Sequence, residues 1–377
     1  MSDWQYSSLG EILPFKYGKG LPKRKRSGTG EFNVVSSAGI TGTHSIALTS
    51  EPCVVIGRKG TIGSLHYCPE PVWPIDTTFY VTGSEQIELR YAYYLLRTLP
   101  LATMNNDSAI PGLNRSQAET IKVCIPDIAE QRRIAGVLGA LDDKIESNQA
   151  VVTGAEKLID EIAEQKATDL PTVALSEVCS LSKSTWKPDT SSDQTVHLFS
   201  LPAFDEGAVP EQAAVSTIKS NKTLVDRPGI LVSRLNPRIS RMWWVETDAT
   251  PVSVCSPEFA YLTAGDMHGL ACTWLAVRSP EFRGEIVDRV TGTSGSHQRV
   301  RPADLMTICV PDYRSLAEHT QMTVLTLLHL VSARRQQSVA LAELRDALLP
   351  ELMSGRMRVD EAGCLVSEAL DEEVADV

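Results

Sequence analysis

A short apolar passage that leads through a proline into a long helical stretch occurs twice in this chain, about half a chain apart. The first copy is IKVCIPD at residues 121–127, and the second is MTICVPD at residues 306–312. After each copy, apolar residues recur at helical spacing with no proline for more than thirty residues, which predicts two long helices. A chain with this pattern is constrained to fold as two similar halves.

Two further pairs of segments support an internal duplication. SSLGEILPF at residues 7–15 is echoed by VALSEVCSL at 173–181, and EPCVVIGRKGTIG at 51–63 is echoed by RPGILVSRLNPRIS at 227–240. The second pair shares a proline, a β-rich apolar run, an arginine and a turn. Because all the pairs come in the same order, the chain reads as globular unit, helix, globular unit, helix.

This order divides the chain into five consecutive parts. We expect globular domains at residues 1–127 and 169–312, long helices at 128–168 and 313–356, and an acidic tail at 357–377. A chain of 377 residues suits two domains better than one. The tail carries so many acidic residues that we expect it to be disordered.

The globular parts combine strands and helices. Runs such as CVVIG, TTFYV, GILVS and RMWWVE are short, rich in β-branched or aromatic residues and bounded by turn formers, so they predict strands. QIELRYAYYLLRTL and GLACTWLAVRSPEFRGEIVDRV predict helices at matching places of the two halves. The fold class is therefore α+β: two mixed domains separated by two long helices packed as an antiparallel coiled coil, with a pseudo-twofold internal repeat.

Spacings that alternate between four and three residues predict a coiled-coil seam along the first long helix. A single polar residue, Asn148, interrupts this seam, and such an asparagine fixes register at a cost in stability. The second helix carries an untidier stripe, broken by Arg334 and Arg335. The alternative is that each helix packs only on its own domain. The predicted seam consists of Ile134, Leu138, Leu141, Ile145, Asn148, Val152, Ile159, Val324, Leu328, Val331, Leu341 and Leu348.

Composition limits the classes of protein that need considering. The eight cysteines are scattered singly, with neither a C-x-x-C pair nor a Cys/His cluster at zinc spacing, which favours free thiols in a reducing cytoplasm. No apolar run is long enough to cross a bilayer. We therefore expect a cytoplasmic protein without a structural metal.

The motifs of the common enzyme classes are missing from the sequence. It contains no Walker A sequence, no G-x-G-x-x-G that opens a βαβ unit, no H-E-x-x-H and no G-x-S-x-G elbow. The glycines of GRKGTIG lack the G-K-[ST] ending of a phosphate loop. We therefore expect no catalytic residues in this chain.

Basic and amide side chains on loops are the remaining candidates for a function. The net charge of −11 argues against nucleic acid, but the distribution of charge matters more than the sum, and the loop KYGKGLPKRKRSGTG is strongly basic. Arginine can bridge O6 and N7 of guanine, and asparagine or glutamine can bridge N6 and N7 of adenine. Taken singly, each residue is better explained as a solvated loop charge, and only the set as a whole favours DNA binding. The candidate DNA-binding residues are Lys19, Lys23, Arg24, Lys25, Arg26, Arg58, Lys59, Asn114, Arg115, Arg234, Asn236, Arg238, Arg241, His297, Gln298 and Arg299.

The sequence resembles a Type I restriction–modification specificity (S) subunit. The resemblance is carried by VVIGRKGTIG, by AIPGLNRSQAETIKVCIPDIAEQRRIAGVLGALDDKIESNQ and by ALLPELMSGRMRV near the end. It implies two target recognition domains that each read one half of a split DNA site, with the two helices acting as a ruler between them. It also implies a non-catalytic chain that binds two modification (methyltransferase) subunits, which hold S-adenosylmethionine, in a holoenzyme with ATP-dependent restriction subunits.

The second half departs from this family pattern. It lacks counterparts of the Glu130-Gln131 and Leu141-Asp142 pairs of the first half, which leaves open whether both halves bind modification subunits equally. The rival interpretation is a duplicated coiled-coil scaffold that binds only proteins. Salt separates the two, because binding through DNA phosphates weakens steeply as salt rises.

Overall fold

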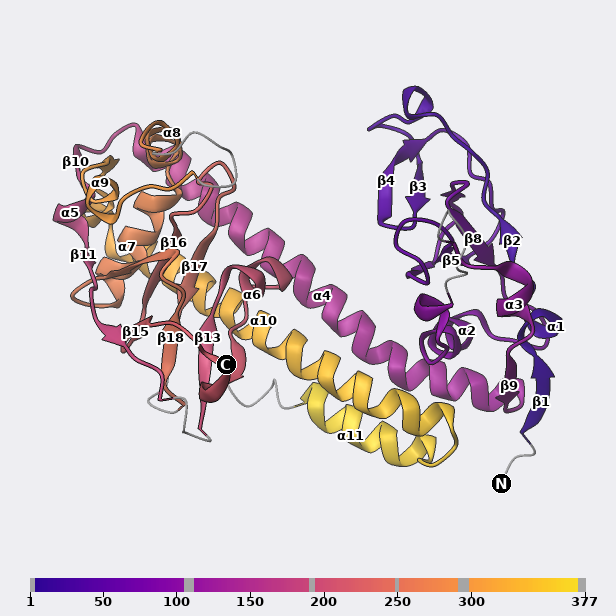
Figure 1. The fold of residues 1–377 in the computed structure, drawn as a ribbon. Helices are drawn as coiled ribbons and strands as arrows, with labels where there is room; N and C mark the ends of the chain where they lie inside the picture. The colour runs from indigo at the N-terminus through magenta and orange to yellow at the C-terminus, as the bar shows by residue number, and fades with distance from the viewer. Residues whose placement is uncertain (1–3, 105–111, 190–193, 248–250, 291–297, 372–377) are drawn as a thin grey trace. The chain divides into compact units, whose positions relative to one another are not determined.

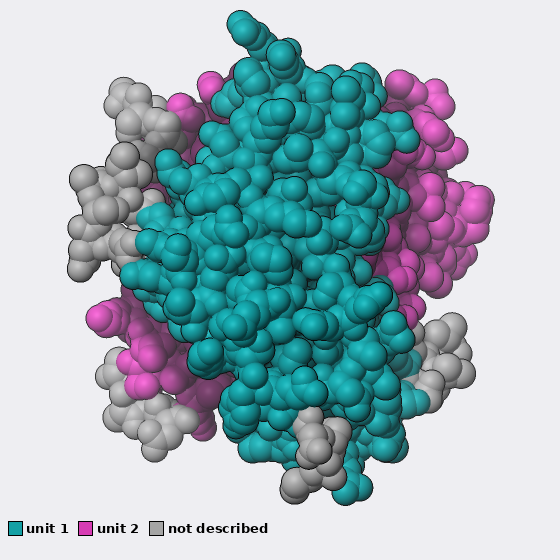
Figure 2. All heavy atoms as spheres, turned by 90° about the vertical axis from the view of Figure 1, so that its right-hand side faces the viewer, with its two compact units in different colours: residues 1–143, 341–377 teal, residues 144–340 magenta. Residues whose placement is uncertain are grey.

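The computed structural model describes residues 4–104, 112–189, 194–247, 251–290 and 298–371. The chain forms two compact units, one of residues 1–143 with 341–377 and the other of residues 144–340 (Figure 2). The two long helices therefore each contribute to both units. In the described part of the chain, no helix is both long and apolar enough to span a bilayer.

The first unit is built on two small sheets and a two-stranded ribbon. In the ribbon, β1 (Gln5–Ser8) pairs antiparallel with β9 (Lys122–Ile125). The first sheet has the order β2-β8-β5-β6, and the second has the order β4-β3-β7. Their strands are β2 (Lys16–Tyr17), β3 (Phe32–Ser36), β4 (Gly39–His44), β5 (Cys53–Gly57), β6 (Leu65–Cys68), β7 (Trp73–Pro74) and β8 (Thr78–Val81).

The first unit contains short helices besides its parts of the two long helices, α4 (Ile128–Ala167) and α10 (Glu318–Met353), which we call the arms. The short helices are α1 (Leu9–Ile12), α2 (Leu89–Arg97), α3 (Arg115–Glu119) and the 3₁₀ turns η1 (Lys23–Lys25) and η2 (Leu101–Thr103). Every residue of β5 is buried, as expected for a continuous apolar run inside a sheet. Helix α2 contacts β5 and β6 and buries five of its nine residues. The strand and helix predictions for CVVIG, TTFYV and the α2 segment are confirmed.

The second unit repeats this topology with additions. Its ribbon pairs β10 (Thr172–Ala174) with β20 (Cys309–Pro311), and its first sheet has the order β11-β19-β16-β17. The second sheet has five strands in the order β12-β15-β18-β13-β14. The strands are β11 (Ser180–Leu181), β12 (Thr185–Trp186), β13 (Thr195–Phe199), β14 (Glu211–Ala214), β15 (Lys222–Val225), β16 (Gly229–Ser233), β17 (Met242–Val245), β18 (Ser253–Cys255) and β19 (Phe259–Thr263).

The second unit combines short helices with the longer α7 (Met267–Arg278) and α8 (Pro280–Asp288). The short helices are α5 (Leu175–Val178), α6 (Leu201–Glu206), α9 (Pro302–Leu305) and the 3₁₀ turns η3 (Val215–Thr217) and η5 (Tyr313–Ser315). Ser279 ends α7 and caps α8 by accepting a hydrogen bond from Phe282 N at 3.2 Å. This cap, followed by Pro280 in the first turn, breaks the helix that the sequence suggested as one.

Backbone hydrogen bonds align the two units residue by residue. Leu9 N donates to Ile121 O at 2.8 Å, and Leu175 N donates to Ile308 O at 2.9 Å. This register matches Ile121 with Ile308, so the two I/V-P-D motifs of the sequence lie two residues apart in the structural alignment. The duplication is real in topology, but the proline motif does not mark identical positions in the two ribbons.

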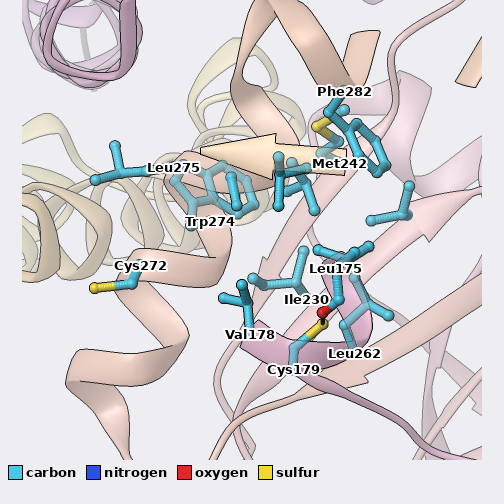
Figure 3. Packing of buried hydrophobic residues seen from close by; sticks show 14 of the residues in the cluster. Leu175, Val178, Cys179, Ile230, Met242, Leu262, Cys272, Trp274, Leu275 and Phe282 are labelled. Atoms are coloured by element: carbon cyan, nitrogen blue, oxygen red, sulfur yellow. Dashed lines mark hydrogen bonds between the residues drawn. The ribbon is translucent and has the colours of Figure 1, made fainter. Parts of the chain in front are cut away.

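The core of the second unit lies between its first sheet and α7. Residues 270–277 of α7 are all buried, which is typical of a helix surrounded by other elements. Figure 3 shows Leu175 gathered with Ile230 and Leu262, and Trp274 and Phe282 lining the same cluster. The apolar strands GILVS and RMWWVE, predicted from the sequence, supply this core.

Helices α4 (Ile128–Ala167) and α10 (Glu318–Met353) run antiparallel and pack together (Figure 1). In the second unit, the buried Asn148 donates from Nδ2 to Gln337 Oε1 at 2.8 Å and to Ser338 Oγ at 3.3 Å. Arg335 on α10 pairs with Glu156 on α4 at 2.8 Å. In the first unit, Arg345 Nη1 donates to Asp142 Oδ1 at 2.6 Å. Polar pairs between the helices therefore accompany the apolar seam.

The expectation of a disordered tail is wrong for the residues that the structure describes. Residues 359–371 form helix α11 (Val359–Asp371), which lies in the first unit. Val359, Ala362 and Val366 are buried, and Arg133 on α4 forms an ion pair with Asp360. Spacings of three and four between these apolar residues were visible in the sequence and outweigh the acidic composition, because they give the helix a buried face.

Candidate nucleic-acid interface

The loop after β5 in the first unit is shaped by glycines. Gly60 and Gly63 adopt φ of +79° and +74°, a region that side chains with Cβ rarely occupy. A Cβ on Gly57 would lie 2.0 Å from Thr61 O, so the chain returns on itself too closely for any other residue. GRKGTIG is therefore a tight turn, and it brings Arg58 and Lys59 to the end of a buried strand.

The backbone of Arg58 is fixed on both sides. Its N–H donates to Thr77 O at 2.9 Å, and its carbonyl accepts from Leu113 N at 2.9 Å. Lys59 N also donates to Thr77 O, at 3.0 Å. Hydrogen bonds to two distant segments of the chain therefore fix the backbone from which the Arg58 side chain extends.

The side chain of Arg58 packs on aromatic rings. Its guanidinium carbon lies 5.1 Å from the ring centroid of Tyr17 and 5.7 Å from that of Phe79. The guanidinium carbon of Arg115 lies 5.8 Å from the same Tyr17 ring. The structure therefore brings Arg58 and Arg115 together around one exposed tyrosine, which the sequence analysis did not single out.

Asn114 and Arg115 begin helix α3. Asn114 is the N-cap, and its side chain accepts a hydrogen bond from Gln117 N at 3.2 Å, so its amide serves the helix. Arg115 pairs with Glu119 through Nε at 2.9 Å. Glu119 Oε1 also accepts from Phe15 N at 2.8 Å, which ties α3 to the segment that precedes β2.

The basic loop before β3 presents three adjacent cations. Lys23, Arg24 and Lys25 form the turn η1 and are all exposed, as is Lys19. Arg26 is different, because it folds back and donates to Leu21 O at 2.9 Å and to Thr41 Oγ1 at 3.3 Å. Arg26 therefore braces the loop, whereas the other four side chains point into solvent.

In the second unit, Arg234 occupies the place of Arg58. Arg234 N donates to Glu258 O at 2.8 Å, and Val300 N donates to Arg234 O at 3.0 Å. Its guanidinium donates to Pro257 O, and burial lowers its pKa. Both units therefore have an arginine at the same backbone position, and the two side chains differ in part of their surroundings.

The carboxylate of Glu258 lies near Arg234. Arg299 binds Glu258 with two hydrogen bonds, of 3.0 and 2.9 Å, and these bonds hold the pKa of Glu258 below its usual value. Arg234 also interacts electrostatically with Glu258. Two of the predicted DNA-binding arginines therefore share an internal acidic neighbour.

The remaining candidates of the second unit divide into structural and exposed residues. Asn236 has φ of +48° and stands where the first unit has Gly60; its N–H donates to Gln298 O at 2.9 Å. Arg241 forms a two-bond ion pair with Asp205 at 2.7 and 2.8 Å. Arg238 is exposed on the same loop. His297 lies outside the described residues.

Residues 114–115 and 297–299, both candidates shortly before the last strand of their half, are not equivalent. The hydrogen bonds to Arg58 O and Arg234 O match Leu113 with Val300. The counterpart of Arg115 is therefore Pro302, while Arg299 corresponds to Gly112. The second unit has no arginine at the α3 position.

The predicted seam residues lie at the interface of the two arms or at the domain–helix junctions. Eleven of the twelve are buried, and Ile145 is half-buried. In the cluster that joins the arms, Val152 and Val331 pack with Ala155 and Leu327. Ile159, Val324 and Leu328 instead belong to the core of the second unit. The arms therefore pack on each other and on the domains, so the two alternatives are not exclusive.

Two polar residues of the first arm join it to its domain, and the sequence analysis noted them only as motif letters. The buried Gln131 donates to Gln86 O and Pro126 O and accepts from Glu88 N. Asp142 accepts from Tyr94 Oη at 2.5 Å as well as from Arg345. The buried amide of Gln131, with its three partners, stabilises the contact between α4 and its domain, because each lost hydrogen bond would leave a buried polar group unsatisfied.

No group of three or more His, Cys, Asp or Glu side chains suited to a metal ion occurs among the described residues. The cysteines of the described chain are all free, and five of the eight are buried.

Comparisons with known proteins found a family model and solved structures to which this chain is similar. Residues 1–154 match the family model of the Type I restriction modification DNA specificity domain. The S subunit of a Type I restriction–modification system from M. genitalium has a similar structure, with a TM-score of 0.63 and 14% sequence identity over 93% of this chain and 96% of that one. The HsdS subunit from Thermoanaerobacter tengcongensis aligns with 15% identity over 97% of this chain and 96% of that one, at a TM-score of 0.30. No curated protein sequence matches the chain.

Proposed function

We propose that this chain, a member of the family of Type I restriction–modification specificity subunits, binds double-stranded DNA at a bipartite site. Each globular domain reads one half of the site. The arms hold the two readers and dock modification subunits, which carry S-adenosylmethionine and perform the methylation. Restriction subunits join this assembly, and the chain itself contributes recognition and no chemistry.

The observation that carries this proposal is that both units hold an arginine, Arg58 or Arg234, at the same backbone position. In both units, an arginine follows a buried strand and is held by backbone hydrogen bonds to two other segments, through Thr77 and Leu113 in one case and Glu258 and Val300 in the other. A side chain that reads a base must start from a fixed backbone, because a flexible loop loses orientation. Two arginines fixed in this way, one in each unit, suit a DNA site that has two halves.

The exposed cations of the first unit support the same function. Lys19, Lys23, Arg24, Lys25 and Lys59 are all exposed, and flexible exposed cations suit DNA phosphates, which fix register without reading sequence. The antiparallel arms supply the spacing between the readers. Asn148, bonded to Gln337 and Ser338 across the helix pair, pins their register.

The experiment is a methylation assay on a random-sequence DNA library. The full chain is co-purified with a candidate modification subunit, supplied with S-adenosylmethionine, and the methylated sequences are read. We expect methylation at one split motif and steep weakening of DNA binding as salt rises. Replacement of residues 2–126 by the domain of a relative should change one half of the motif only.

The arms are tested separately. Insertion of one heptad into α4 and one into α10 should lengthen the gap between the half-sites, and an unchanged gap would contradict the ruler. A complex that methylates nothing selectively, and whose affinity for DNA ignores salt, would instead support the protein-only scaffold.

A further inference from the structure

Tyr17 is an exposed aromatic residue at the edge of the first sheet. It lies on β2, opposite Phe79 of β8, and 53% of it is exposed. Its ring meets that of Phe79 edge to face, with centroids 5.0 Å apart and an interplanar angle of 65°. The ring is therefore held by the sheet on one edge while much of it remains open to solvent.

Two arginines from distant parts of the chain converge on this ring. Arg58 comes from the turn after β5 and Arg115 from the first turn of α3, and both guanidinium groups lie within 6 Å of the Tyr17 centroid. Bringing two cations together is unfavourable by itself, and attraction to the ring face offsets part of that cost. A site that holds two cations near one ring is arranged for an electron-rich partner.

Each arginine is also oriented by a second contact. Glu119 holds Nε of Arg115 at 2.9 Å, and this contact leaves the two terminal nitrogens of the guanidinium to other partners. Arg58 lies against Phe79 as well as Tyr17. Guanidinium planes fixed in this way differ from the exposed lysines nearby, which are free to follow a phosphate backbone. Fixed donor forks suit the adjacent O6 and N7 acceptors of guanine.

The second unit lacks this arrangement at the corresponding positions. Lys16 pairs with Tyr80 in the first unit, and Ser182 N donates to Tyr261 O in the second, so Lys16 corresponds to Ser182. The next residues along the chain, Tyr17 and Lys183, therefore also correspond. Phe79 corresponds to Ala260, because each is paired with the strand residue two before the arginine. Neither of these two counterparts, nor Pro302 in place of Arg115, can form such a cluster. The cluster is therefore a property of the first reader and not of the shared framework.

We propose that Tyr17 is a positioning residue that sets the base preference of the first domain, by holding Arg58 and Arg115 as donor forks for guanine in the DNA major groove. This inference rests on the proposed function and adds the chemistry of one half-site. Tyr17 acts through the two arginines and need not touch the DNA.

The test compares matched variants of the full chain on a random duplex library, with selection by binding and sequencing of the bound DNA. Tyr17→Leu removes the ring, and Tyr17→Phe keeps it. Tyr6→Leu makes the same change at an exposed tyrosine of β1 in the same unit, where 84% of the residue is exposed. Melting temperatures are recorded for all variants, and the dependence of affinity on salt is measured for each.

We expect guanine at defined positions of one half-site for the wild type and for Tyr17→Phe and Tyr6→Leu. Tyr17→Leu should reduce that preference by about tenfold while leaving the other half-site and the salt dependence unchanged. Arg115→Lys, which keeps the charge but loses the fork, should reduce the preference in the same way. This second variant tests the idea even if Tyr17→Leu folds poorly.

Three results would overturn the inference. The first is a half-site without guanine, and the second is a Tyr17→Leu protein with an intact preference. The third is a uniform loss of affinity with a weaker salt dependence, which would place the two arginines on phosphates. A wild type that shows no sequence preference at all would overturn the proposed function itself, so the two failures are distinguishable.

Discussion

The two compact units hold an arginine at the same backbone position and differ in part of what surrounds its side chain. Both guanidinium groups are half-buried and donate to an equivalent carbonyl, Asp76 O at 3.4 Å for Arg58 and Pro257 O for Arg234. Arg58 also lies against the rings of Tyr17 and Phe79, whereas Arg234 lies near the carboxylate of Glu258. The residue that accepts the arginine N–H is Thr77 in one unit and Glu258 in the other. The comparison shows that the duplication preserves the backbone position of the arginine and one carbonyl partner, whereas its other neighbours differ between the units.

Some contacts between the arms and the domains occur in both units, and others occur in only one of them. Arg97 ends α2, stacks over Tyr93 and pairs with Asp346 at 2.9 Å. Arg278 ends α7, stacks over Trp274 and pairs with Asp160 at 2.6 Å. In both units, therefore, an arginine at the end of the main helix stacks on an aromatic ring and forms an ion pair with an aspartate of an arm. The Asp142 contacts, in contrast, belong to the first unit. Equivalent hydrogen bonds from Gln131 Nε2 to Pro126 O and from Gln321 Nε2 to Leu316 O align α4 with α10, and this alignment puts Ser332 at the position of Asp142.

The largest effect that distinguishes the units is expected at Asp142. Asp142→Ala removes the acceptor of both Tyr94 and Arg345 and should lower the free energy of unfolding of the first unit by about 3 kcal/mol. The matched variant Ser332→Ala should change stability by less than about 0.5 kcal/mol. Chemical denaturation of both variants measures this difference, and equal losses would show that the two junctions are alike after all.

The second prediction concerns DNA affinity. Arg58→Ala should weaken binding to the preferred site by about 10- to 100-fold, because a bidentate base contact is worth about 1–3 kcal/mol. It should change the melting temperature little, because the bond that its guanidinium donates to the exposed Asp76 is long, at 3.4 Å. Arg234→Ala should also lower the melting temperature, since it leaves Pro257 O without its donor. Titration of labelled DNA and thermal melting separate the two outcomes. Arg58→Ala that melts early would mean that its role is structural.

The third prediction tests the turns beneath the arginines. Gly60 and Asn236 share a left-handed conformation, with φ of +79° and +48°. Gly60→Ala should cost about 1–2 kcal/mol of stability, whereas Asn236→Gly should change it by less than about 0.5 kcal/mol. Melting curves test both. A large loss for Asn236→Gly would indicate that the asparagine side chain matters as well as the backbone conformation.

The smallest predicted effect is a dependence on pH in the second unit. Arg299 holds the pKa of Glu258 below its usual value of 4.5. Because the folded-state pKa is the lower one, the carboxylate stabilises the fold above pH 4.5, and this contribution is lost as the pH falls through the folded-state pKa. Glu258→Thr, which installs the residue of the first unit, should flatten stability against pH below about 4.5. Unfolding curves at several acidic pH values would reveal an unchanged slope if the pair contributes nothing.

Much of the fold was readable from local sequence. The buried strands CVVIG and GILVS and the long arms follow from apolar runs and helical periodicity, and they form where predicted. The turn GRKGTIG was readable too, because glycine spacing reflects backbone requirements. The α11 helix was missed because acidic composition was given more weight than the spacing of Val359, Ala362 and Val366.

The candidate site was only partly readable. The exposed cations Lys23, Arg24 and Lys25 stand on a loop as expected, but Arg26, Arg241 and Arg299 bind partners within the chain. These partners lie between 5 and 41 residues away in the sequence, so an arginine that braces a loop looks the same in sequence as one that faces solvent. Tyr17 stood inside the basic stretch, and only its neighbours in space reveal its importance.

The sequence by itself determined the duplicated order of domain and arm, the strands, the turns and the seam, because periodicity and glycine positions act over a few residues. Only the tertiary structure decided which cations are held inside the chain, and that two arginines from separate segments meet on one tyrosine. The physical reason is range: hydrogen bonds, ion pairs and cation–π contacts act over a few ångströms in space, between groups that the chain separates by tens of residues.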